Sequence, residues 1–195
     1  MKQELSALVN KKSVLTIPNL LSLVRLALIG PIVWAFVGQR NSVLTAVLLT
    51  ASGATDVADG WIARHFNMIS PVGKALDPLA DKLTQFAVLI CLATRYPVMR
   101  LPLAMLVIKE FATGLMGLLV IRYTGDVLGA EWHGKVVTCM LYALMLAHIL
   151  WKEMPRGLSN ILTGLCMAMM AVSFALYARR NLRAIQGGRH LSDGR

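Results

Sequence analysis

Apolar residues are gathered into six long runs along the chain, separated by short stretches rich in Gly, Pro, Asn and Ser. Each run is about 20 residues long, roughly the length that an α-helix needs to cross a hydrocarbon core ~30 Å thick. The separating stretches, such as GQRNS and KEMPRG, contain the residues that interrupt helices. The pattern therefore predicts an all-α integral membrane protein with six transmembrane helices, at residues 19–38, 43–64, 75–94, 102–122, 135–151 and 159–178.

This pattern also predicts how the chain is organised. Residues 19–178 are expected to form one six-helix transmembrane domain. The preceding segment, residues 1–18, is expected to be cytoplasmic, and it either forms a short helix in the membrane interface or remains disordered. A basic tail, residues 179–195, is expected to be cytoplasmic and frayed.

Composition and charge agree with a membrane protein. The chain is 56% hydrophobic and 15% charged, whereas a soluble domain is about 25% charged. The net charge of +10 does not indicate nucleic-acid binding, because no basic stripe with stacking aromatic residues accompanies it. With the N-terminus inside, twelve Lys and Arg residues flank the inner ends of the runs and five flank the outer ends. This asymmetry predicts a multi-pass protein of the cell membrane with both termini in the cytoplasm.

Four aspartates interrupt the second and third apolar runs. Asp56 and Asp59 are three residues apart, and Asp77 and Asp81 are four apart, so each pair shares one helical face. An antiparallel hairpin with its connection at residues 65–74 would bring the two pairs level with each other. A carboxylate at bilayer depth costs roughly 2.5–3.5 kcal/mol, so four of them need compensation.

Three explanations fit this spacing. The carboxylates could hold divalent cations, for which an all-oxygen site suits Mg²⁺ or Mn²⁺. They could line an ion or proton path, or they could form structural ion pairs with Lys82 or Arg64. Small residues near the aspartates, Gly60, Ala63 and Gly73, favour the first explanation, because they leave room for a bulky ligand. With Arg64 able to bind phosphate oxygens, these residues together indicate a diphosphate site.

The complete spacing, DxxDGxxAR followed by eight residues and then GxxxDxxxD, resembles the signature of the CDP-alcohol phosphatidyltransferase family. The number and length of the predicted helices also resemble that family, so the resemblance covers nearly the whole chain. It implies an enzyme that uses two divalent cations, Mg²⁺ or Mn²⁺, to transfer a phosphatidyl group from CDP-diacylglycerol to an alcohol, with release of CMP. It also implies a homodimer and contact with membrane lipid.

The resemblance assigns roles to individual residues. Asp56, Asp59 and Asp77 would bind the metals, and Asp81 would be both the general base and a ligand close to the second metal. Asn19, Gly60, Ala63, Arg64 and Gly73 would bind CDP-diacylglycerol.

Weaker sequence features indicate the identity of the acceptor alcohol. TIPNLLSLVRLALIGPIVWAF, LDPLADK and GKVVTCMLYAL resemble the phosphatidylglycerophosphate synthase branch of the family, whose acceptor is glycerol 3-phosphate. Lys109, Arg122 and Lys135 are the candidates for binding the acceptor phosphate, although Lys109 could simply pair with Glu110. The alternatives within the family are a cardiolipin synthase that uses phosphatidylglycerol and an enzyme for inositol phosphate or serine. From other classes, the alternatives are a divalent-ion or proton transporter and a non-catalytic membrane scaffold.

Overall fold

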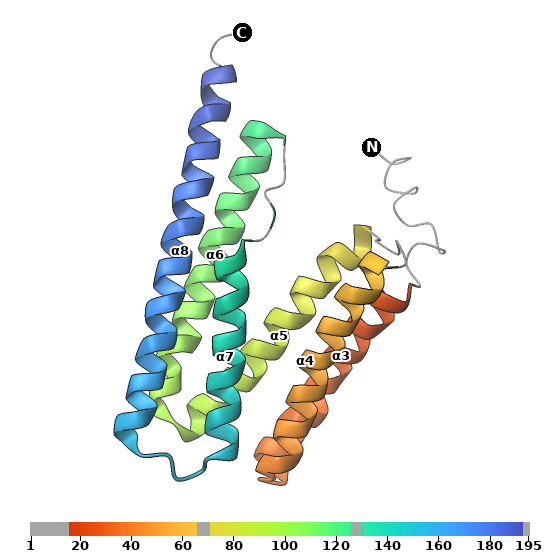
Figure 1. Cartoon of the computed structure of the whole chain (residues 1–195), viewed down its shortest axis with the longest axis vertical. Helices are drawn as coiled ribbons and strands as arrows, with labels where there is room; N and C mark the ends of the chain where they lie inside the picture. Colours follow the sequence, from red (N-terminus) through yellow and green to blue (C-terminus); the bar gives the residue numbers. More distant parts are fainter. Residues whose placement is uncertain (1–15, 66–70, 126–128, 130, 193–195) are drawn as a thin grey trace. The chain divides into compact units, whose positions relative to one another are not determined.

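The computed structural model describes residues 16–65, 71–125, 129 and 131–192, and within these residues the regular elements are all helical. Six α-helices follow one another along the chain (Figure 1), and they carry the labels α3 to α8. Their bounds are α3 Ile17–Val33, α4 Ser42–His65, α5 Pro71–Arg95, α6 Arg100–Thr124, α7 Trp132–Leu150 and α8 Arg156–Ser192. A short π-helix, Trp34–Gly38, extends α3, and a 3₁₀ turn, Pro97–Met99, precedes α6.

The six predicted helices are present at the predicted places, with one difference. The sixth was expected to end at residue 178 with a frayed tail beyond it, but α8 continues to Ser192. The stretch after residue 178 contains no proline and no glycine before Gly187, so nothing in it interrupts the helix. Arg180 also bonds to Glu131, which ties this extension to the rest of the protein. The possible interfacial helix before residue 16 lies outside the described residues.

Four elements are long and apolar enough to cross a membrane, among the residues that the structure describes: Ile17–Gly38, Pro97–Thr124, Trp132–Leu150 and Arg156–Gly187. Large apolar side chains lie on their outer surfaces, for example Phe111 at 75% exposed and Leu118 at 67% exposed, as expected of helices in contact with lipid. Helices α4 and α5 have 24 and 25 residues, but one end of each carries the aspartates. Their passage through the membrane therefore stays a prediction.

Local chemistry explains several helix ends. The Asn41 side chain accepts a hydrogen bond from the backbone N–H of Leu44, at 3.0 Å, and so caps the start of α4. Pro71 occupies the first position of α5, where no backbone N–H is needed. Gly125 ends α6 in the left-handed conformation, φ 75°, and donates to the carbonyl of Ile121.

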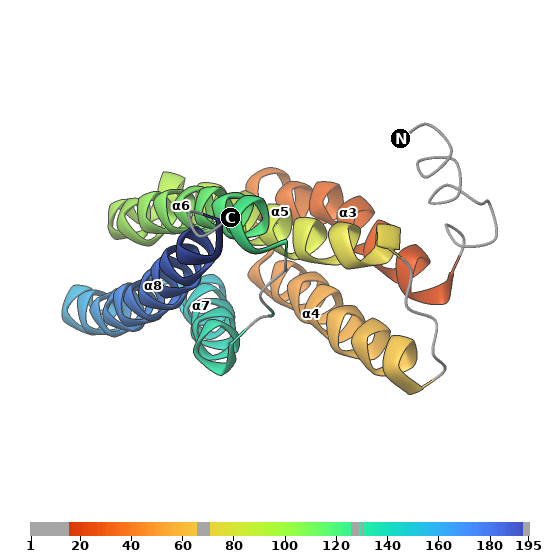
Figure 2. The same cartoon turned by 90° about the horizontal axis from the view of Figure 1, so that it is seen from above.

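The chain divides into two compact units. The first contains α3, α4, α5 up to Leu92 and residues Ile149–Lys152, with α3 packed along α4. Its buried residues include Ile32, Leu49 and Leu89. In this unit α4 and α5 run in opposite directions (Figure 1). The second contains α6, α7 up to His148 and α8, with α6 side by side with α8 (Figure 2). Leu106 on α6 and Met170 on α8 are both buried.

Candidate active site

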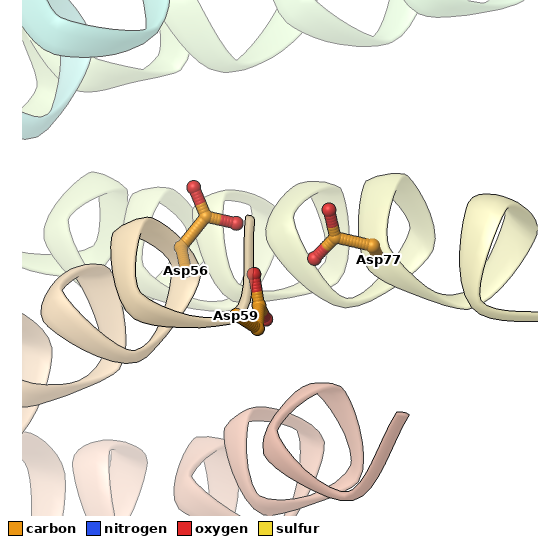
Figure 3. A group of neighbouring side chains, drawn as sticks. All are labelled: Asp56, Asp59 and Asp77. Atoms are coloured by element: carbon orange, nitrogen blue, oxygen red, sulfur yellow. The ribbon is translucent and has the colours of Figure 1, made fainter. Parts of the chain in front are cut away.

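Three carboxylates converge in the first unit. Asp56 and Asp59 lie on α4 and Asp77 lies on α5 (Figure 3). One carboxylate oxygen of each residue lies within 4.8 Å of those of the other two. The helical spacing and the antiparallel hairpin predicted this approach of the two helices. We call these three residues the aspartate cluster.

Asp81 lies one turn further along α5 than Asp77 and is not part of the aspartate cluster. Its Oδ2 accepts a hydrogen bond of 2.9 Å from Nε2 of Gln85, the residue one turn later on the same helix. Gln85 is buried, at 1% exposed, so this bond fixes the orientation of the Asp81 carboxylate.

Arg25 on α3 contacts all three residues of the aspartate cluster. Its Nη2 donates to Oδ2 of Asp59 at 2.5 Å, and its Nη1 donates to Oδ1 of Asp77 at 3.1 Å. The same Nη1 forms an ion pair with Oδ1 of Asp56. The sequence indicated Lys82 or Arg64 as possible partners of the aspartates and did not indicate Arg25, so this contact was missed.

Burial strengthens the electrostatic interactions among these four side chains. The side chain of Arg25 is 0% exposed and that of Asp59 is 2% exposed, whereas Asp56 and Asp77 are about two-fifths exposed. Unit charges about 4–5 Å apart interact by roughly 3–4 kcal/mol at an effective dielectric constant near 20. Three carboxylates share one guanidinium, so two formal negative charges remain uncompensated among these four side chains.

The donor set of the aspartate cluster fits a divalent cation. All three candidate ligands are carboxylate oxygens, which Mg²⁺ and Mn²⁺ prefer to nitrogen or sulfur ligands. The partial exposure of Asp56 and Asp77 leaves the cluster accessible to ions, and the excess negative charge attracts cations.

The predicted donor-lipid residues belong to the same helices. Asn19 is buried on α3, at 3% exposed, while Gly60 on α4 and Gly73 on α5 are each partly exposed. Ala63 and Arg64 belong to the end of α4, and their side chains lie outside the part of the chain that the structure describes.

The three predicted acceptor-binding residues lie in the second unit. Lys109 is 7% exposed, and its Nζ forms an ion pair with Oε1 of Glu110 at 2.7 Å. This pair matches the structural alternative for Lys109. Arg122 in the last turn of α6 and Lys135 in the first turns of α7 are exposed. They lie at the ends of two helices that residues 125–131 connect.

A polar network fixes the start of α7 on α8, next to Lys135. Nδ1 of His133 lies 2.8 Å from Oγ of Ser173, and the backbone N–H of Glu131 donates to the hydroxyl of Tyr177 at 3.0 Å. A Cβ at Gly134 would lie 2.6 Å from the Tyr177 hydroxyl oxygen, so a side chain there would require the Tyr177 ring to shift. These contacts join residues 40 or more positions apart, so helical spacing gave no signal for them.

Comparison with known proteins agrees with this arrangement. The family model of CDP-alcohol phosphatidyltransferase matches residues 15–181. The chain therefore belongs to the CDP-alcohol phosphatidyltransferase family, and it is a membrane-associated transferase of phospholipid biosynthesis.

Three relatives illustrate the range of this similarity. A CDP-diacylglycerol–glycerol-3-phosphate 3-phosphatidyltransferase of Bacillus subtilis is 30% identical over 189 residues, covering 87% of this chain and 97% of the relative. A protein of the same name from Rickettsia bellii is 36% identical over 97 residues, covering 49% of this chain and 54% of the relative. A cardiolipin synthase (CMP-forming) of Streptomyces coelicolor is 40% identical over 87 residues, covering 42% of this chain and 40% of the relative.

Proposed function

We propose that the protein transfers the phosphatidyl group of CDP-diacylglycerol to a hydroxyl of glycerol 3-phosphate and releases CMP, as a phosphatidylglycerophosphate synthase. The observation that carries this proposal is the convergence of Asp56, Asp59 and Asp77 from two helices, with carboxylate oxygens within 4.8 Å of one another. The Bacillus relative that aligns along nearly its whole length is named for this reaction, which supports glycerol 3-phosphate as the acceptor.

The residues that would hold the two divalent cations, Mg²⁺ or Mn²⁺, are Asp56, Asp59 and Asp77, with Asp81 close to the second. When bound, such cations neutralise the oxygens of a diphosphate and stabilise an in-line displacement at phosphorus. Asn19, Gly60, Ala63, Arg64 and Gly73 would surround the cytidine diphosphate part of the donor. The small residues leave space for it, and the Arg64 guanidinium would bind its phosphate oxygens.

Asp81 would be the general base of the reaction. The acceptor hydroxyl oxygen forms a bond to the phosphorus that carries diacylglycerol, and its proton passes to the Asp81 carboxylate. The bond from that phosphorus to the CMP oxygen breaks, and CMP leaves with the electron pair. The hydrogen bond from Gln85 to Oδ2 supports this role, because it orients the carboxylate.

The phosphate of the acceptor would be bound by exposed cations of the second unit. Arg122 and Lys135 are the stronger candidates, because Lys109 already pairs with Glu110. The polar network around Tyr177 holds the start of α7 in place, so the position of Lys135 is well defined within this unit.

The proposed setting is the bacterial cell membrane. All six helices would cross it, with both termini in the cytoplasm, so the polar ends of α4 and α5 would lie at the cytoplasmic boundary. A diacylglycerol donor stays in the bilayer while its head group reaches water at this depth. The family resemblance also implies a homodimer.

A cardiolipin synthase is the second candidate, because the Streptomyces relative of that name is 40% identical over 87 residues. Purified protein with CDP-diacylglycerol and Mn²⁺ should be offered glycerol 3-phosphate, phosphatidylglycerol, inositol 1-phosphate and serine in turn, and CMP should be measured. CMP release that depends on glycerol 3-phosphate supports the proposal. Release with phosphatidylglycerol alone identifies the cardiolipin synthase instead. The Asp81→Asn variant serves as the inactive control in each reaction.

A further inference from the structure

Arg25 lies where three acidic side chains meet, on a helix that contributes none of them. Its guanidinium contacts Asp56, Asp59 and Asp77 and is 0% exposed. Among the described residues, its Nε is a buried polar atom with no hydrogen-bond partner. A charged arginine side chain stays buried in this way only while anions compensate its charge.

We propose that Arg25 is an exchangeable counter-cation of the aspartate cluster: it offsets part of the cluster's negative charge when no metal is bound, gives up these contacts when divalent cations bind, and then binds the diphosphate of the donor. This inference rests on the proposed function, because it assumes that the cluster binds divalent cations. It adds a donor-binding residue on α3 and a step that orders metal binding before donor binding.

The first part follows from competition for the same carboxylates. Arg25 contacts one oxygen of each residue in the aspartate cluster, and a metal held by this cluster would need the same three carboxylates. A guanidinium and a divalent cation that share carboxylates a few ångströms apart also repel each other. Arg25 therefore opposes metal binding in the resting state.

The second part follows from burial. A displaced guanidinium that stays inside the protein without an anion is strongly unfavourable. A diphosphate supplies negative oxygens, and the planar guanidinium binds phosphate oxygens in pairs. The unpartnered Nε adds a further N–H donor for such an oxygen.

The test is equilibrium Mn²⁺ binding to the full-length chain in detergent, measured from the electron paramagnetic resonance signal of free Mn²⁺. Arg25→Met should bind Mn²⁺ at least tenfold more tightly than the wild type, because the competing cation is gone. Without metal its unfolding midpoint should fall by roughly 5–15 °C, since three carboxylates lose their partner. Mn²⁺ should then raise that midpoint by more than it does in the wild type.

A matched control is Arg180→Met, which makes the same chemical change and removes an ion pair with Glu131 in the second unit. Its Mn²⁺ affinity should equal that of the wild type. A second measurement follows CDP binding at saturating Mn²⁺ by calorimetry. Arg25→Met should bind CDP about tenfold or more weakly than the wild type, the scale of a lost charge-assisted hydrogen bond.

Each outcome decides the proposal. Equal or weaker Mn²⁺ binding by Arg25→Met shows that Arg25 organises the aspartates rather than competing with metal, and unchanged CDP binding removes the second step. A wild-type protein that binds no Mn²⁺ contradicts the metal-dependent function itself, and this inference with it. If Arg25→Met is not recovered folded, Arg25→Lys must show an Mn²⁺ affinity above that of the wild type, because lysine keeps the charge but contacts fewer oxygens. An unchanged affinity in that variant overturns the proposal.

Discussion

Replacing Asp59 by Asn removes one negative charge from the aspartate cluster and keeps the size of the side chain. The substitution distinguishes a metal site from a structural ion-pair network. In a structural network Asp59 stabilises the fold by pairing with Arg25, at 2.5 Å, so its loss lowers stability. In a metal site the same residue stabilises the metal-free protein little, because two other carboxylates repel it.

The expected effect without metal is small. Asp59 is repelled by Asp56 and Asp77, whose oxygens lie within 4.8 Å, and is attracted by Arg25. Each interaction is roughly 3–4 kcal/mol before water screens the half-exposed partners, so removal of the charge relieves about one such repulsion. Loss of the charge-assisted hydrogen bond to Arg25 costs about 1.5–3 kcal/mol. The two changes nearly cancel, and the free energy of unfolding should change by less than about 2 kcal/mol.

With metal the effect should be large. Asp59→Asn removes a ligand and a charge, and the Mn²⁺ affinity should fall by at least about a hundredfold. The assay is the unfolding midpoint in detergent, first with EDTA and then with Mn²⁺. Wild-type protein at an Mn²⁺ concentration about 100 times the dissociation constant should gain about 2.7 kcal/mol, and Asp59→Asn should gain almost nothing.

Glu131→Gln is the matched control. It removes the partner of one Arg180 ion pair of 2.5 Å in the second unit and leaves the aspartate cluster intact, so it should keep the full Mn²⁺ response. The reasoning is refuted if Asp59→Asn loses several kcal/mol in EDTA and still responds to Mn²⁺ like the wild type. The cluster would then be a structural ion-pair network.

Three further substitutions test other parts of the account. Asp81→Asn should retain Mn²⁺ and CDP binding while turnover falls by ~10²-fold or more, the scale of a general base; near-normal turnover would remove Asp81 from that role. Lys135→Ala should raise the apparent KM for glycerol 3-phosphate more than that for CDP-diacylglycerol, whereas equal changes in steady-state kinetics would argue against acceptor binding. Gly134→Ala should lower the unfolding midpoint by the equivalent of about 1–3 kcal/mol, because its Cβ would meet the Tyr177 hydroxyl at 2.6 Å. Adding Tyr177→Phe to this variant should recover part of the lost stability. No recovery would mean that the contact with the Tyr177 hydroxyl is not the cause of the loss.

Much of the fold could be predicted, because membrane helices are recognised in a sequence as long apolar runs separated by residues that interrupt helices. The run at 43–64 became α4, Ser42–His65, and the run at 102–122 became α6, Arg100–Thr124. The end of α8 could not be predicted from hydropathy, since its last turns are polar.

Helical spacing was enough to predict that the aspartates of the site lie together. Asp56 and Asp59 share a face, and the hairpin brings Asp77 to them. The role of Arg25 required the third helix, because its partners lie 31 to 52 positions away in the chain. A usable signal existed nonetheless, since an arginine inside an apolar run is costly and implies buried anions elsewhere.

The central claim is that the aspartate cluster is the divalent-cation centre of a CDP-alcohol phosphatidyltransferase. The most direct test measures CMP release from CDP-diacylglycerol and glycerol 3-phosphate, and Mn²⁺ binding, on one preparation over the same range of Mn²⁺ concentrations. CMP release should be absent in EDTA, rise as the binding sites fill, and disappear in Asp56→Asn together with tight Mn²⁺ binding. Undiminished CMP release in EDTA, or full Mn²⁺ binding and turnover by Asp56→Asn, would contradict the claim.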